Sequence, residues 1–173
     1  MAGRFTHILV PTDFNAASDA ALACAKELAL RFDAHLSLLH VVTDPMATGV
    51  CTPDVFVPAT SEMRDTCLRN ARKRLEAALT VEEQTRFGAR IEVTIGDAAD
   101  AIEQFARDEH VDLIVMGTHG RRGLAHMLLG SVAERLVRLA PCPVMTTHAE
   151  IQPEAASEIE GRKQAAPEML RVL

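Results

Sequence analysis

Short apolar runs and amphipathic stretches alternate along most of this chain. The runs are rich in Val, Ile and Leu and end at Pro, Gly or a polar residue, which is typical of buried strands. In the stretches between them, apolar residues recur every three to four positions, as on one face of a helix. These patterns predict strands at residues 7–10, 36–42, 89–95, 111–116 and 143–147. They predict helices at residues 16–32, 61–79 and 131–139, and a further helix that begins after Asp97.

The ends and inner faces of these helices can also be predicted. Asn15 or Ser18 is available to cap the first helix, and Asp97 resembles a cap for the third. Residues 43–60 hold three prolines and one glycine, so we expect one long loop there. The side chains expected to face the sheet are, helix by helix, Ala21, Leu22, Ala25, Leu28, Ala29 and Phe32; Met63, Cys67, Ala71, Leu75 and Ala78; Ile102, Phe105 and Ala106; and Val132, Leu136 and Val137.

The alternation of strands and helices predicts an α/β fold. It implies a five-stranded parallel sheet with helices on both faces, joined by right-handed crossovers. With the strand order 3-2-1-4-5, the first and fourth strands flank the point where the order reverses. Ligands bind at such a point, beyond the carboxyl ends of the strands. Asp13 follows the first strand and Gly117 ends the fourth, so we expect both residues at one crevice.

A glycine-rich segment follows the fourth strand. It begins with GTHG at residues 117–120, and Gly130 and Ser131 stand nine residues later at the start of the last helix. The unpaired N–H groups and the dipole of a helix N-terminus suit it to holding phosphate. Glycine is expected there because it permits a positive φ and lets a ligand approach the backbone. A structural turn alone would explain Gly117, but it explains Gly120, Gly130 and Ser131 together less well.

The segment matches neither of two well-known nucleotide motifs. No Lys follows Gly120, so it is not a P-loop, and PTD at residues 11–13 stands where a dinucleotide-binding chain has its glycines. Arg121 and Arg122 come directly after Gly120. Either one of them contacts phosphate, or both belong to a solvated loop.

Composition excludes several classes of protein. At 173 residues, with 48% hydrophobic and 24% charged residues, the chain is long enough for one soluble domain with its own core. A net charge of −6 argues against a surface for nucleic acid or anionic membranes. We find no signal peptide and no apolar run near the roughly 20 residues that span a bilayer, so membrane insertion is not expected.

The cysteines and the C-terminal segment complete this picture. No two cysteines form a C-x-x-C pair, so we interpret them as reduced thiols of a cytoplasmic protein. The remaining histidines are scattered and do not suggest a metal site. We expect one domain over residues 1–148 and a flexible or loosely helical extension over residues 149–173, with a partner-binding helix as the alternative. The cysteines are Cys24, Cys51, Cys67 and Cys142.

Taken together, the motifs resemble the ATP-binding branch of the universal stress protein family. That branch carries Gly-x2-Gly-x9-Gly-(Ser/Thr), which Gly117, Gly120, Gly130 and Ser131 match in full. The resemblance covers roughly residues 4–148 and implies a fold like that of the adenine nucleotide alpha-hydrolases. Further segments that match family signatures are Ile8–Asp13, Leu39–Val42, Asp112–Gly117 and Pro141–Val144.

The resemblance implies a site for ATP. Asp13 would contact the adenosine, most simply its ribose hydroxyls, or it would instead cap the first helix. Backbone groups of Val41 would meet the adenine edge, with Pro11 and Thr12 on the same wall. A triphosphate is expected to arrive with Mg²⁺, which Ser131 or Thr118 can meet through water. The residues expected around the glycine segment are Met116, Gly117, Thr118, His119, Gly120, Arg121, Gly130, Ser131 and Val132, although a neutral His119 is a weak ligand for an anion.

The first functional hypothesis is an ATP-binding regulator of the stress response that acts on an unidentified protein partner. No carboxylate near the glycine segment is an evident base, and Glu134 is expected to face solvent, so the chain is at most a slow ATPase. One alternative is a dimeric interaction module that needs no nucleotide. Another is an adenylating ligase, but the signature expected after the first strand is absent.

A homodimer is also predicted. The last strand, at residues 143–147, is expected at an edge of the sheet and carries neither Lys nor Glu. Such an edge exposes unpaired N–H and C=O groups that a second copy can pair in a two-fold arrangement. The alternative is that residues 149–173 fold back and cover the strand.

Overall fold

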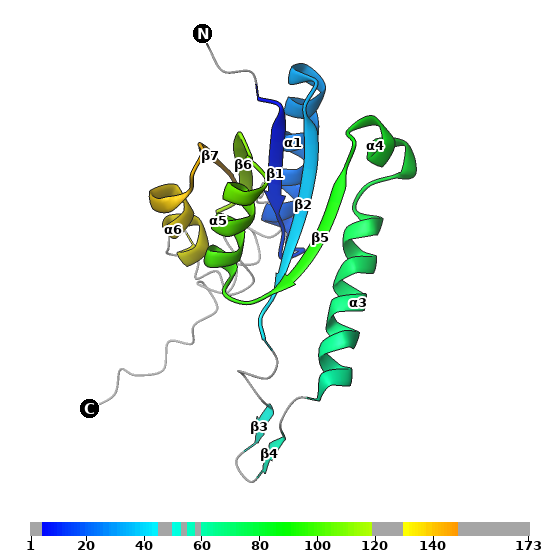
Figure 1. Cartoon of the computed structure of the whole chain (residues 1–173), viewed down its shortest axis with the longest axis vertical. Coiled ribbons are helices and arrows are strands. Elements are labelled where there is room, and N and C mark those ends of the chain that lie inside the picture. Colours follow the sequence, from blue (N-terminus) through cyan, green and yellow to red (C-terminus); the bar gives the residue numbers. More distant parts are fainter. Residues whose placement is uncertain (1–4, 45–49, 53–54, 58–59, 119–129, 149–173) are drawn as a thin grey trace, which may run out of the picture.

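The computed structural model describes residues 5–44, 50–52, 55–57, 60–118 and 130–148. Five parallel strands form the main sheet, in the order β5-β2-β1-β6-β7 (Figure 1). Counted along the chain within this sheet, that order is 3-2-1-4-5, so the predicted α/β architecture is confirmed. The strands are β1 (His7–Pro11), β2 (His35–Val42), β5 (Arg90–Ile95), β6 (Leu113–Gly117) and β7 (Val144–Thr147).

Helices cover both faces of the sheet. On one face α1 (Ala16–Phe32) and α3 (Ser61–Ala77) enclose one buried cluster, and on the other α5 (Ala98–Asp108) and α6 (Ser131–Leu139) enclose a second. Side chains of β1 alternate between the two clusters, with Ile8 in the first and Leu9 in the second. Both are fully buried, and burial of one such side chain stabilises the fold by about 1.5–3 kcal/mol.

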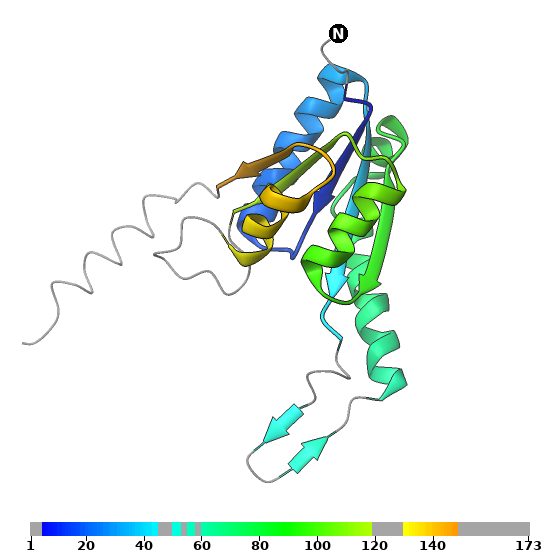
Figure 2. The same cartoon turned by 60° about the vertical axis from the view of Figure 1, so that its left-hand side comes forward.

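Three short elements were not predicted. Within residues 43–60, expected as one loop, β3 (Val50–Thr52) and β4 (Val55–Val57) pair antiparallel. This hairpin lies beyond the carboxyl ends of the main strands in both views (Figures 1 and 2). Helix α4 (Val81–Arg86) has no buried residue, so it has no apolar stripe to reveal it. Its one signal in the sequence is the capping box of Thr80 and Glu83.

Three side chains expected on inner faces are exposed instead. In α6, Ala133 and Leu136 are buried, which turns Val137 outward and leaves it 54% exposed. The first turns of α3 lie below the ends of the strands, so they have no sheet to pack against (Figure 1). Met63 is therefore 42% exposed, and Cys67 is exposed as well.

The parts of the chain that the structure describes contain neither a membrane-spanning helix nor a group of metal-ligating side chains. No described helix combines the length and apolarity needed to span a membrane. Among the same residues, no three His, Cys, Asp or Glu side chains are grouped as metal ligands would be. Residues 149–173, where we predict an extension, lie outside the described part of the chain.

Candidate functional site

The predicted site residues that the structure describes meet at the carboxyl edge of the sheet. β1 and β6 are neighbours, so the residues that follow Pro11 and Gly117 emerge side by side. The amide of Thr12 donates to the carbonyl of Leu39 (2.9 Å), which continues the ladder of β1 with β2 beyond the strand end. Val41 lies two residues further along β2 at the same edge. The convergence expected from the strand order is therefore present.

Side chains fix the turn between β1 and α1. The hydroxyl of Thr12 accepts from the amide of Phe14 (3.0 Å) and donates to the hydroxyl of Ser18 (3.0 Å). Nδ1 of the buried His40 donates to the carbonyl of Thr12 (2.6 Å). Phe14 itself has φ 63°, in the left-handed region that few bulky residues adopt. These hydrogen bonds fix the backbone on both sides of Asp13.

Asp13 is not the cap of α1, which was the alternative role considered for it. The cap is Asn15, whose Oδ1 accepts from the amide of Ser18 (2.8 Å) while the hydroxyl of Ser18 accepts from the amide of Asn15 (3.0 Å). The carboxylate of Asp13 accepts from both the backbone amide and the side-chain amide of Asn15, at 3.3 Å and 3.2 Å. The carboxylate of Asp13 therefore lies beside the N-terminus of α1 but does not cap the helix.

The base of the glycine segment is held by Thr118. Its carbonyl accepts from the amide of Gly130 (2.6 Å), which joins the two ends of residues 119–129. Its amide donates to the carbonyl of Thr147 (2.9 Å), and its hydroxyl lies 2.9 Å from Nδ1 of His148. Thr118 is only 2% exposed, whereas Ser131, the other residue expected near Mg²⁺, is exposed. Of the other predicted residues, His119, Gly120 and Arg121 lie outside the described part of the chain.

Neither Gly117 nor Gly130, the two described glycines of the motif, is required by its backbone conformation, but Gly117 is required by packing. The expectation of a positive φ is wrong for Gly130, which has φ −71°, and Gly117 is not among the positive-φ glycines either. A Cβ at Gly117 would lie 2.8 Å from the backbone carbon of Ala17 and 2.8 Å from its Cβ. Gly117 thus allows the N-terminus of α1 to pack against the end of β6.

The N-terminus of α6 differs from those of the other described helices. Asn15, Thr60, Thr80 and Asp97 cap α1, α3, α4 and α5 with side-chain oxygens. At α6 the cap position is Gly130, and no side chain caps the helix. The first-turn N–H groups, which begin with the exposed Ser131 and the half-buried Val132, are therefore suited to an external anion.

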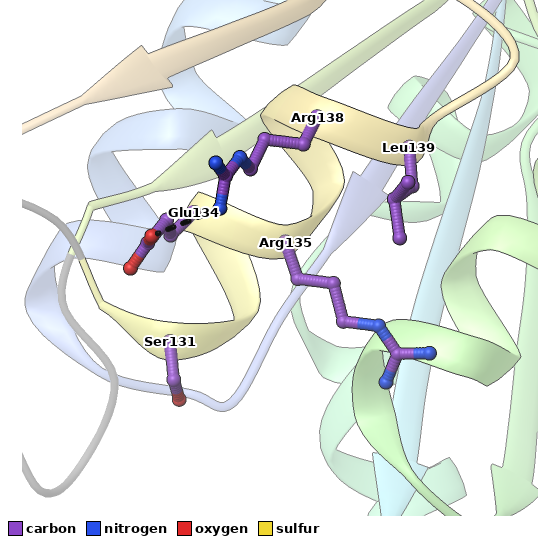
Figure 3. A pocket seen from close by; sticks show the side chains of 5 residues that line it. All are labelled: Ser131, Glu134, Arg135, Arg138 and Leu139. Atoms are coloured by element: carbon purple, nitrogen blue, oxygen red, sulfur yellow. Dashed lines mark ion pairs between the residues drawn. The ribbon is translucent and has the colours of Figure 1, made fainter.

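A shallow hollow of about 330 Å³ lies on the outward face of α6, where Leu139 forms part of the wall (Figure 3). Glu134 is exposed, as predicted, and pairs there with Arg138 at 3.7 Å. Arg135 points the other way and pairs with Asp97 (3.1 Å) and Asp100 of α5. Ser131 lines this hollow as well, so the hollow adjoins the start of α6. Its charged side chains are already paired, and the candidate site is therefore taken as the sheet edge at Asp13 and Gly130.

Comparisons with known proteins agree with this geometry. Residues 4–148 match the universal stress protein family. Universal stress protein YxiE of Bacillus subtilis is 34% identical over 147 residues, which are 82% of this chain and 97% of that protein. The solved structure of MJ0577 from Methanocaldococcus jannaschii superposes with a TM-score of 0.71 at 26% identity, over 87% of this chain and 100% of that one.

Two more distant structures show nucleotides in related proteins. A family protein from Arabidopsis thaliana, with AMP bound, is 22% identical over 84% of this chain and 93% of that one, with a TM-score of 0.54. A universal stress protein in complex with cAMP is also 22% identical, over 86% of this chain and 100% of that one, with a TM-score of 0.53.

Proposed function

The chain belongs to the universal stress protein family, and we propose that it is an ATP-binding member acting as a cytoplasmic, nucleotide-dependent regulator in the stress response. The observation that carries the proposal is the start of α6. There a complete Gly-x2-Gly-x9-Gly-Ser motif ends at a helix without a side-chain cap, at the sheet edge that also carries Asp13. The relatives with AMP and cAMP support a nucleotide as the ligand class.

The residue roles follow from the positions of the groups. Asp13 would accept hydrogen bonds from the ribose hydroxyls, and the backbone of Val41 would meet the adenine edge beside Pro11 and Thr12. The phosphates would lie against the first-turn amides of α6, where the positive end of the helix dipole favours negative charge. The hydroxyl of Ser131 is exposed there and can meet a Mg²⁺ ion that accompanies the triphosphate.

Little in the described part of the chain favours hydrolysis. Hydrolysis requires a group that positions water at the γ-phosphate. The carboxylate nearest to Ser131 in the sequence is Glu134, which turns outward and pairs with Arg138. We therefore propose a protein that binds ATP and hydrolyses it slowly at most, so that occupancy by ATP is the signal read by a protein partner.

Thermal unfolding with and without Mg-ATP tests the proposal. A ligand that binds only the folded state adds about 2.7 kcal/mol of stability at 100 times its dissociation constant. We expect the melting temperature to rise with Mg-ATP and the rise to saturate. An unchanged melting temperature at millimolar Mg-ATP would favour the alternative, an interaction module that needs no nucleotide.

We further propose a homodimer that pairs through β7. The two edges of the sheet differ: β5 carries the exposed Arg90 and the half-buried Glu92, with Arg90 paired to Glu109, and such charges protect an edge from pairing. β7 carries no charged residue, and Met145 on it is 39% exposed.

Met145→Lys should therefore convert the dimer to a monomer at micromolar concentration, because it places like charges across the two-fold axis. Light scattering would measure the molar mass of the parent, of this variant and of Val81→Lys, which changes an equally apolar and more exposed residue on α4. The Val81→Lys protein should stay dimeric. A monomeric parent that dimerises once residues 149–173 are removed would show instead that this segment covers β7.

A further inference from the structure

The side chain of Asn15 bonds in two directions, and its two roles are different. Its Oδ1 accepts from the amide of Ser18 at 2.8 Å, which caps α1. Its Nδ2 donates to Oδ2 of Asp13 at 3.2 Å, and its backbone amide lies 3.3 Å from Oδ1 of the same carboxylate. Because only an oxygen can accept from the amide of Ser18, the cap bond itself fixes which atom faces Asp13.

We propose that Asn15 is a positioning residue for the nucleotide: it orients the carboxylate of Asp13 toward the ribose, an inference that rests on the proposed function. Each carboxylate oxygen of Asp13 has one donor from Asn15, so the plane of the carboxylate is fixed. An ionised carboxylate has about four acceptor positions, so these two contacts do not use up its acceptors. The ribose hydroxyls would meet a group that is already oriented, which lowers the entropy lost on binding.

The choice of residue at position 15 agrees with this role. Asn, Asp and Ser all cap helices well, so capping alone does not require Asn. Asn carries the acceptor for Ser18 and the donor for Asp13 on two separate atoms, whereas Asp has no donor and Ser would have to serve both partners with one hydroxyl. An Asp at the same position would cap equally well but would place two carboxylates side by side, which disfavours the ionised form of each.

The preceding residue brings Asn15 back toward Asp13. Phe14 has φ 63°, a backbone conformation that is strained for a residue of this kind. Its ring lies 4.5 Å from the ring of His40, centroid to centroid, and the guanidinium of Arg74 lies 3.9 Å from the centre of the same ring. Contacts of this type offset the strain. The strained turn next to Asp13 is thus held by residues of β2 and α3.

Asn15→Asp, with Asn15→Ser as its matched control, tests the proposal. Calorimetry would give the dissociation constants of the parent and both variants for Mg-ATP and for Mg-2′,3′-dideoxy-ATP, which lacks the ribose hydroxyls. We expect Asn15→Asp to bind Mg-ATP about tenfold or more weakly, the usual effect of losing a hydrogen bond to a charged group. Asn15→Ser should lose less, because it removes the Nδ2 amide group without adding a charge.

The dideoxy nucleotide separates positioning from a structural effect. With no ribose hydroxyl for Asp13 to hold, the parent and both variants should bind it equally. The melting temperature of Asn15→Ser should stay close to that of the parent, because the cap is retained. Equal losses for both nucleotides, or no loss with Mg-ATP, would overturn the role of Asn15. If Asn15→Asp does not fold, the same comparison is made with Asn15→Ser. A parent that binds neither nucleotide would overturn the proposed function instead.

Discussion

Helices α5 and α6 lie on the same face of the sheet, and each follows the carboxyl end of a strand, but their N-termini are completed differently. At α5 the carboxylate of Asp97 accepts from the amides of Ala99 and Asp100, both at 3.1 Å. At α6 the corresponding residue is Gly130, and no side chain among the described residues caps the helix. The chain supplies the anion itself at the first helix, and we propose that a ligand supplies it at the second.

The amino end of the sheet resembles α5 in this respect. There Asp112 accepts from the amide and the hydroxyl of Thr6, at 2.8 Å and 2.7 Å, and from the amide of His7 at 3.0 Å. The hydrogen bond from the hydroxyl of Thr6 is the main reason that the pKa of Asp112 is lowered. Backbone N–H groups that bond to a carboxylate of the chain itself contribute to folding stability. N–H groups that bond to a ligand contribute to its affinity instead, so substitutions at the two kinds of position should have different effects.

Gly130→Asp gives the largest expected effect, because it places at α6 the type of cap that α5 already has. The new carboxylate would occupy the position proposed for the phosphates, and like charges placed together cost several kcal/mol. We expect Mg-ATP to bind about a hundredfold or more weakly. Stability should be unchanged or rise by a few tenths of a kcal/mol, as measured by urea unfolding.

Asp97→Ala is the matched control at α5. Loss of this cap should cost about 1 kcal/mol of stability and leave the dissociation constant of Mg-ATP unchanged. If Gly130→Asp binds Mg-ATP like the parent, the phosphates do not lie at α6.

Gly117→Ala should have the second largest effect, which is a loss of folding stability. The added Cβ would lie 2.8 Å from two atoms of Ala17, one of which belongs to the backbone and cannot rotate away. Overpacking of this kind costs about 1–3 kcal/mol. Gly130→Ala is the comparison within the same motif, since φ −71° suits any residue. Equal stability of the two variants in urea unfolding would contradict the packing role of Gly117.

Much of this arrangement could be predicted from the sequence. The bounds of α1 were predicted exactly, as residues 16–32, because a good cap and a continuous apolar stripe mark them. The strand order followed from the alternation of elements. The inner face of α6 was less predictable, because Val132, Leu136 and Val137 are all apolar and only packing decides that Val137 faces solvent.

The sequence motifs predict which residues lie near the proposed site, but not their contacts. The strand order pointed to Asp13 and Gly117, since they stand at the ends of the two strands that flank the reversal of strand order. The reason for Gly117 lies in a neighbour 100 positions away, Ala17, and no local pattern reveals it. Likewise, the side-chain amide of Asn15 could be recognised as a cap, but its bond to Asp13 depends on the left-handed turn at Phe14.

The smallest expected effect concerns the pH dependence of the amino end, where His7 is buried. Its Nδ1 donates to the carbonyl of Glu109 (3.0 Å), which leaves Nε2 to accept from the hydroxyl of Ser37 (2.8 Å). Burial, and then the nearby charge of His35, lowers the pKa of His7 below its ordinary value of 6.5; the two rings are stacked with their centroids 4.0 Å apart. Hydrogen bonding to Glu109 and the nearby charge of Asp112 oppose this shift without cancelling it.

The sign of the pH effect follows from this lowered pKa. Just below pH 6.5 the unfolded chain binds a proton at His7 that the folded chain resists, so the contribution of His7 to stability is complete above pH 6.5 and declines as the pH falls further. Urea unfolding between pH 7.5 and 5.5 should show a decline that is shallower in His7→Gln. His35→Gln should also be shallower, because it removes a group that lowers the pKa of His7. The decline should have the same slope with and without adenosine, since the proposed nucleotide site lies at the opposite, carboxyl edge of the sheet. A slope that His7→Gln leaves unchanged would assign the pH dependence to other groups.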